Sequence, residues 1–98
     1  MPQYFPPHPG GNTTTLNISA TTVLKSAPGR VYVVSVVTAG TAAGAIYDST
    51  STTWNTAANQ IGVIPAAVGT YYFYGMPTAT GIVVSPPTVT GVVSASWA

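Results

Sequence analysis

Short hydrophobic runs and turn residues alternate along this chain at intervals of about ten residues. Val, Ile, Tyr and Thr dominate the runs from residue 13 onward, and clusters of Gly, Pro and Ser separate them. No window longer than two turns keeps a helical period without a Gly, Pro or Thr cluster. Short strands at this spacing indicate a sandwich or barrel, because alternating strands and helices need longer segments. We expect seven or eight strands, at about residues 13–19, 22–26, 30–38, 43–48, 58–64, 70–75, 80–85 and 88–97.

The expected strands differ in how clearly hydrophobic and polar residues alternate along them. In the last strand, residues 89, 91, 93, 95 and 97 are Val, Gly, Val, Ala and Trp, while the other face carries mostly Thr and Ser. Near the start, Leu16, Ile18 and Ala20 are expected to share one face. Segment 31–37 is apolar on both faces, as is typical of a strand covered on both sides. The prediction is an all-β protein: an antiparallel, jelly-roll-like β-sandwich.

The first twelve residues form a separate compositional unit. Four of the first nine are proline, and Gly10, Gly11 and Asn12 follow. Proline favours extended backbone, so we expect an extended arm over 1–12 and a sandwich domain over 13–98. A disordered terminus is the alternative. Because a merely solvated tail needs no aromatic anchors, the arm is expected to lie on a neighbouring subunit. Its candidate contact residues are Tyr4, Phe5, Pro6 and Pro7.

Charge is almost absent from this sequence. Charged residues make up 3% of the chain, against roughly 25% in an ordinary soluble domain. Such a surface has little repulsion to keep copies apart, which favours self-association. Two basic residues are too few for nucleic-acid binding, and no apolar stretch is long enough to span a membrane. We therefore expect neither a nucleic-acid nor a membrane partner.

Groups for catalysis are equally scarce. The chain has one Asp, no Glu, one His and no Cys. General acid–base chemistry needs paired titratable groups, and His8 lies forty residues before Asp48. Thiolate nucleophiles and thiolate metal sites are impossible without cysteine. The sequence predicts a protein that is not an enzyme, with no catalytic, cofactor-binding or metal-binding residues.

Asp48, the single acidic residue, follows the strand-forming residues Ala45, Ile46 and Tyr47 and precedes Ser49. An Asp at this position can accept hydrogen bonds from amides one or two residues further on, forming an Asx-turn. That local structural role is the interpretation we favour over a ligand contact. An ion pair with Lys25 or Arg30 is a second possibility, and it would contribute little if exposed.

The aromatic run 71–74 is YYFY, so two of its side chains face each side of a strand. One pair should therefore be core, and Tyr72 and Tyr74 are our interface candidates. Trp54 lies in the polar segment STSTTWN and is the third candidate. Such aromatics suit contact with a protein or stacking on a sugar, although Trp54 could also fold back onto the domain.

Residues 24–93 carry a familiar series of strands and turns. The segments are LKSAPGRVYVVSVVTAG, GAIYDSTS, IGVIPAAVGTYYFYGMPTATGIVV and TVTGVVS. This series resembles a group of small bacteriophage virion proteins. The resemblance implies a β-sandwich subunit that coats or cements a capsid, or that sits in a tail or fibre. The proline-rich arm is not part of the shared pattern.

Together these observations predict a phage capsid decoration, or cement, protein. It would self-associate, most plausibly as a trimer, and bind the major capsid protein through apolar and hydrogen-bonding contacts. It would be made in the host cytoplasm without a signal peptide and act on the virion surface. The alternative is a carbohydrate- or receptor-binding module of a phage tail or fibre that uses exposed Trp and Tyr. A bacterial surface subunit would require a secretion signal, which the N-terminal segment lacks.

Overall fold

The computed structural model describes residues 13–98 as eight strands and their connecting loops, without a helix in that range. The expected arm over 1–12, with Tyr4, Phe5, Pro6 and Pro7, lies outside the described residues. The strands are β1 (Thr13–Ile18), β2 (Thr22–Lys25), β3 (Arg30–Thr38), β4 (Gly44–Tyr47), β5 (Gln60–Ile64), β6 (Gly69–Pro77), β7 (Ile82–Ser85) and β8 (Val92–Trp97). No helix among the described residues is long and apolar enough to cross a membrane.

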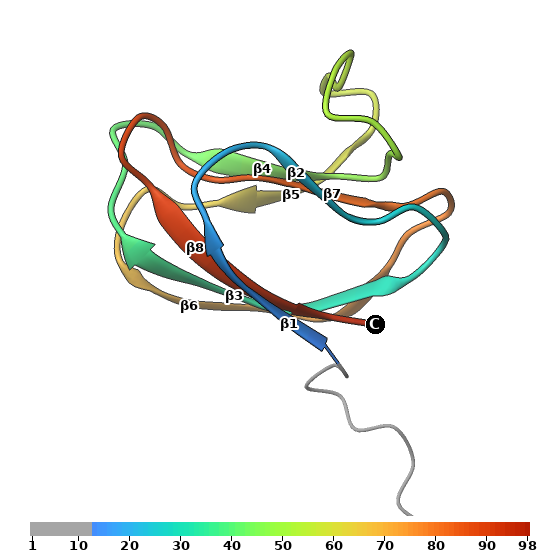
Figure 1. Cartoon of the computed structure of the whole chain (residues 1–98), viewed down its shortest axis with the longest axis horizontal. Helices are drawn as coiled ribbons and strands as arrows, with labels where there is room; N and C mark the ends of the chain where they lie inside the picture. Colours follow the sequence, from blue (N-terminus) through green and yellow to red (C-terminus); the bar gives the residue numbers. More distant parts are fainter. Residues whose placement is uncertain (1–12) are drawn as a thin grey trace, which may run out of the picture.

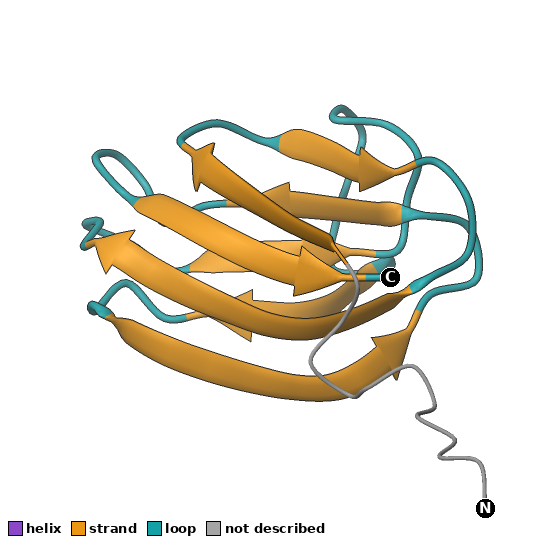
Figure 2. Cartoon of the chain, turned by 60° about the horizontal axis from the view of Figure 1, so that its bottom comes forward, coloured by secondary structure: helices purple, strands orange, loops and turns teal. Residues whose placement is uncertain are grey.

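The strands pair as a nested series. The first pairs with the last, β2 with β7, β3 with β6 and β4 with β5, all antiparallel. Antiparallel pairing of β3 with β8 and of β4 with β7 joins these strand pairs into two sheets, ordered β1-β8-β3-β6 and β2-β7-β4-β5. Figure 1 shows the two sheets as facing layers, and Figure 2 shows the first sheet from its outer side. The predicted jelly-roll-like β-sandwich is confirmed.

The core lies between the sheets and is built almost entirely from Val and Ile. Each such side chain contributes about 1.5–3 kcal/mol when fully buried. Tyr71 and Phe73 of β6 pack against this cluster, so they form the core pair of the aromatic run. The buried members are Ile18, Val31, Val34, Val36, Ile46, Ile64, Ile82, Val84, Val93 and Ala95.

The predicted alternation of the first strand is wrong at one position. Ile18 is buried, but Leu16 is exposed. The register with β8 shifts between Thr15 and Ile18, where Asn17 takes a positive φ of 57°. Asn tolerates this left-handed conformation better than most residues, and the resulting bulge turns Leu16 outward.

Two further face predictions need correction. The outer side of β3 is only partly covered, because Val37 is exposed while Tyr32 and Val33 are half-buried. Val89 was expected in the last strand, facing the same side as Val93. The strand begins instead at Val92, and Val89 lies in the preceding loop with its side chain 81% exposed.

Candidate functional site

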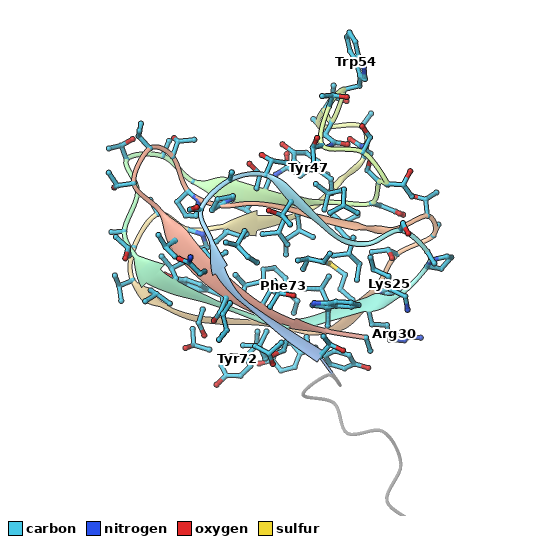
Figure 3. The ribbon with its side chains drawn as sticks, viewed as in Figure 1. Lys25, Arg30, Tyr47, Trp54, Tyr72 and Phe73 are labelled. Atoms are coloured by element: carbon cyan, nitrogen blue, oxygen red, sulfur yellow. The ribbon has the colours of Figure 1, made fainter. Side chains whose placement is uncertain are left out.

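The two ends of the sandwich differ in charge. All three charged side chains of the described residues, Lys25, Arg30 and Asp48, lie at the ends of strands on one side of the molecule; Figure 3 labels the two cations there. We call this side the charged end; its loops are 26–29, 48–59 and 78–81. The opposite side is the uncharged end, formed by the loops 19–21, 39–43, 65–68 and 86–91.

Asp48 joins two loops of the charged end. Its carboxylate accepts hydrogen bonds from the backbone N–H of Ala79 at 2.9 Å and of Thr80 at 2.8 Å. The Thr80 hydroxyl adds a bond at 2.8 Å, and the Gly81 amide adds one at 3.4 Å. The single acidic side chain therefore holds the β6–β7 loop against the end of β4.

The predicted Asx-turn at Asp48 is wrong in its partners. The amides that the carboxylate accepts lie 31 to 33 residues further on, instead of one or two. The local turn is made by Ser49, whose hydroxyl accepts from the Ser51 amide at 3.1 Å. Arg30, one of the two cations considered as an ion-pair partner, uses its Nη1 to donate to the Gly75 carbonyl at 2.8 Å.

The same hydrogen bonds set the acidity of Asp48. Partial burial acts to raise the pKa of this carboxyl, but the bonds from Ala79, Thr80 and Gly81 outweigh it and hold the pKa below its ordinary value. A carboxylate with a lowered pKa and occupied oxygens is a weak proton acceptor. Asp48 is therefore suited to holding loops together and poorly suited to general-base chemistry.

The β4–β5 loop presents Trp54. This side chain is 93% exposed, has a positive φ of 67° and projects from the top of the loop in Figure 3. The loop is braced by its own polar groups. Asn55 Nδ2 donates to the Ser51 carbonyl at 2.7 Å, and Asn59 Nδ2 donates to Asn55 Oδ1 at 2.8 Å. Asn59 Oδ1 in turn accepts from the Thr56 amide at 2.8 Å. Polar side chains thus stabilise the loop while its one large apolar side chain faces solvent.

Tyr72 and Tyr74 form a second exposed aromatic group. They lie on the outer face of β6, where their ring centroids are 6.0 Å apart at an interplanar angle of 30°. Tyr74 is 85% exposed and Tyr72 is 60% exposed, and the latter points out below the sheet in Figure 3. The three candidates of the described sandwich are therefore all accessible, but the structure does not bring Trp54 together with the tyrosines. Their roles as contact residues stay predictions.

A groove lies at the uncharged end, between the β1–β2 turn and the β7–β8 loop. Its volume is about 270 Å³. Pro86 and Pro87 are buried along it, and the exposed Val89 borders it. Thr21 Oγ1 donates to Ser85 Oγ at 3.2 Å and so links its two sides. Its lining residues are Ser19, Ala20, Thr21, Ser85, Pro86, Pro87, Thr88 and Val89.

Sequence reasoning did not identify this groove. Pro86 and Pro87 fall between two expected strands and so indicate a turn. The segment 19–21 lies more than sixty residues earlier, and nothing in the sequence indicates that it contacts this turn. Only the pairing of β2 with β7 brings these segments together. Among the described residues, there is also no group of three or more His, Cys, Asp or Glu side chains that could hold a metal ion.

Comparison with known proteins adds no relative: no family model, curated protein or solved structure matches this chain. The fold and the surfaces described above therefore carry the functional argument.

Proposed function

We propose that this protein is a non-enzymatic structural subunit of a phage virion, a capsid decoration or cement protein. It self-associates, with a trimer favoured, and binds the major capsid protein. The observation that carries the proposal is the display of large apolar side chains over a jelly roll with almost no charge. Those exposed residues are Leu16, Val37, Trp54, Val63, Val68, Tyr72, Tyr74 and Val89.

Physical chemistry supports association as the role of this surface. Apolar area removed from water contributes about 25 cal/mol per Å², before the cost of association is subtracted. With a formal net charge of +1, copies repel one another little, and few charges have to be desolvated on contact. A surface of this kind favours stable packing against other subunits over a monomeric state in solution.

The virion assignment rests on two further supports. The first is the resemblance of residues 24–93 to small phage virion proteins. The second is the architecture, since double-sheet jelly rolls occur among viral capsid domains as well as among lectins. Fold-level likeness of this sort is an association and needs its own test.

The deciding experiment measures mass in solution by light scattering, for the full chain and for a version that lacks residues 1–12. The proposal predicts a discrete oligomer, and loss of that oligomer on truncation assigns the arm to contacts between subunits. Mass spectrometry of purified particles of the phage that encodes the chain should then detect it in many copies. A monomer in both versions, or absence from particles, contradicts the proposal.

A second candidate function is binding of a carbohydrate or receptor at a tail tip. It is favoured by one observation, the exposure of Trp54 on a braced polar loop, since an accessible indole face suits stacking on a sugar. This function predicts glycan binding by the isolated protein that falls sharply in Trp54→Ala. The decoration function predicts no such binding.

A further inference from the structure

Trp54 and the groove at the uncharged end are complementary in three ways. The first is size. The groove, at about 270 Å³, is smaller than the roughly 300–1,000 Å³ of typical small-molecule sites, so it suits one large side chain better than a whole ligand. Trp54 is the largest exposed side chain of the described residues, and it stands clear of its loop.

The second match is chemical. The Pro86-Pro87 segment and Val89 offer apolar surface to an indole ring, and the hydroxyls of Ser19 and Thr88 offer acceptors for its N–H. Neither the 49–59 segment nor the groove contains a charged residue, so docking would desolvate no ion.

The third match is position. Trp54 lies on a loop of the charged end, whereas the groove opens at the uncharged end of the same molecule. We infer that Trp54 of one copy docks into the groove between the β1–β2 turn and the β7–β8 loop of the next copy. This inference rests on the self-association proposed above and names the contact that produces it.

A contact between two different surfaces of the same protein is heterologous. It closes into a ring when the rotation between neighbours fits, and otherwise builds an open chain. In a ring of three, every copy would contribute one Trp54 and one groove, and no docking surface would be left free. A knob-and-groove contact is thus compatible with the proposed trimer when neighbouring copies are related by a rotation of about 120°.

Two substitutions remove the two halves of the contact separately. Trp54→Ala removes the knob, and Val89→Asp places a carboxylate beside the groove. Each has a matched control: Thr52→Ala shortens another exposed side chain of the same loop, and Ala67→Asp places a carboxylate at the same end but outside the groove lining. All four residues are exposed, so each variant should keep the fold, which circular dichroism checks.

The expected result is that Trp54→Ala and Val89→Asp lower the mass measured by light scattering to that of one copy, while both controls assemble as the wild type does. Mixing the two deficient variants then gives the sharper test. The variant with aspartate at 89 still has Trp54, and the variant without Trp54 still has an intact groove. Their mixture should therefore form a complex whose mass rises with concentration toward two copies.

Other outcomes separate this inference from the proposed function. A wild-type oligomer that Trp54→Ala leaves intact overturns the docking contact but not self-association. A mixture that stays at one copy also overturns the head-to-tail contact. A wild-type monomer at every concentration overturns both.

Discussion

The loops of the charged end and the loops of the uncharged end are held in place by different kinds of hydrogen bond. At the charged end, one carboxylate gathers the 79–81 segment through bonds of 2.8 to 3.4 Å. At the uncharged end, neutral groups do the same work: Thr88 exchanges backbone bonds with Ala42, and Thr90 Oγ1 donates to the Ala39 carbonyl at 2.8 Å. The comparison shows that a loop cluster needs satisfied polar groups and does not need charge.

This difference also divides the surface. The end that carries the three charged side chains also carries the Trp54 loop, whereas the other end exposes Val68 and Val89 and contains the uncharged groove. Two unlike ends on one subunit make a heterologous contact, in which one surface meets a different one, geometrically available.

The largest expected effects concern glycines, because each end has a glycine packed closely against backbone. A Cβ atom at Gly81 would lie 2.5 Å from the Ser49 carbonyl oxygen, and one at Gly40 would lie 2.5 Å from the Thr88 carbonyl oxygen. Gly81→Ala and Gly40→Ala should each lower the free energy of unfolding by about 3 kcal/mol, measured by urea denaturation, because backbone has to move. Gly62→Ala is the control: its nearest neighbour is the Phe73 side chain at 3.0 Å, and a loss below about 1.5 kcal/mol is expected. A small loss at either Gly81 or Gly40 would show that its end is loosely packed.

Asp48→Ala tests what is particular to the charged end. Removing the carboxylate leaves the amides of Ala79 and Thr80 without their acceptor, which should cost about 2 kcal/mol of unfolding free energy. Hydrogen exchange should quicken at residues 79–81 and stay unchanged at residues 40–42. Asp48→Asn keeps one acceptor oxygen and should cost less. Equal acceleration at both ends would mean that the carboxylate stabilises the whole sandwich instead of one loop.

The pH dependence follows from the lowered pKa of Asp48. A carboxyl whose pKa is lower in the folded than in the unfolded chain stabilises the fold above its unfolded pKa of about 4. That contribution is lost as the pH falls through the folded pKa. The wild type should therefore exceed Asp48→Asn in stability at neutral pH, and thermal denaturation should show the difference shrinking below about pH 4. A difference that stays constant down to pH 2 would contradict this role.

At the uncharged end, removing a single hydroxyl hydrogen bond should lower the free energy of unfolding by less than removing the Asp48 carboxylate does. Thr90→Val removes the bond from Thr90 Oγ1 to the Ala39 carbonyl and should cost about 1 kcal/mol, with no dependence on pH. Thr90→Ser keeps the hydroxyl and serves as the control. A cost as large as that of Asp48→Ala would remove the energetic distinction between the two ends.

Much of the fold could be predicted from the sequence because its signals are local. Turn residues placed all eight strands to within a few residues, and alternation separated Tyr71 and Phe73 from Tyr72 and Tyr74. The bulge that exposes Leu16 depends on the backbone of Asn17 and on the register with β8, which alternation cannot detect.

The candidate surfaces also differ in whether the local sequence could predict them. Trp54 was predicted as a contact residue from its polar neighbours alone, and it is fully accessible. The partners of Asp48 and the groove between 19–21 and 85–89 both depend on loops joined by distant strand pairing. Such contacts follow from the order of strands in the sheets, and nothing in the local sequence specifies that order.

Salt should have the smallest effect, and it tests whether charged side chains take part in assembly. If apolar surface drives self-association, raising NaCl from roughly 0.05 to 0.5 M should change the association constant by no more than about twofold, because screening has few exposed ion pairs to weaken. Sedimentation velocity at matched protein concentrations measures this directly. Weakening by tenfold or more would instead place Lys25, Arg30 or Asp48 in the contact, and the uncharged contact between Trp54 and the groove would then not be the one through which copies meet.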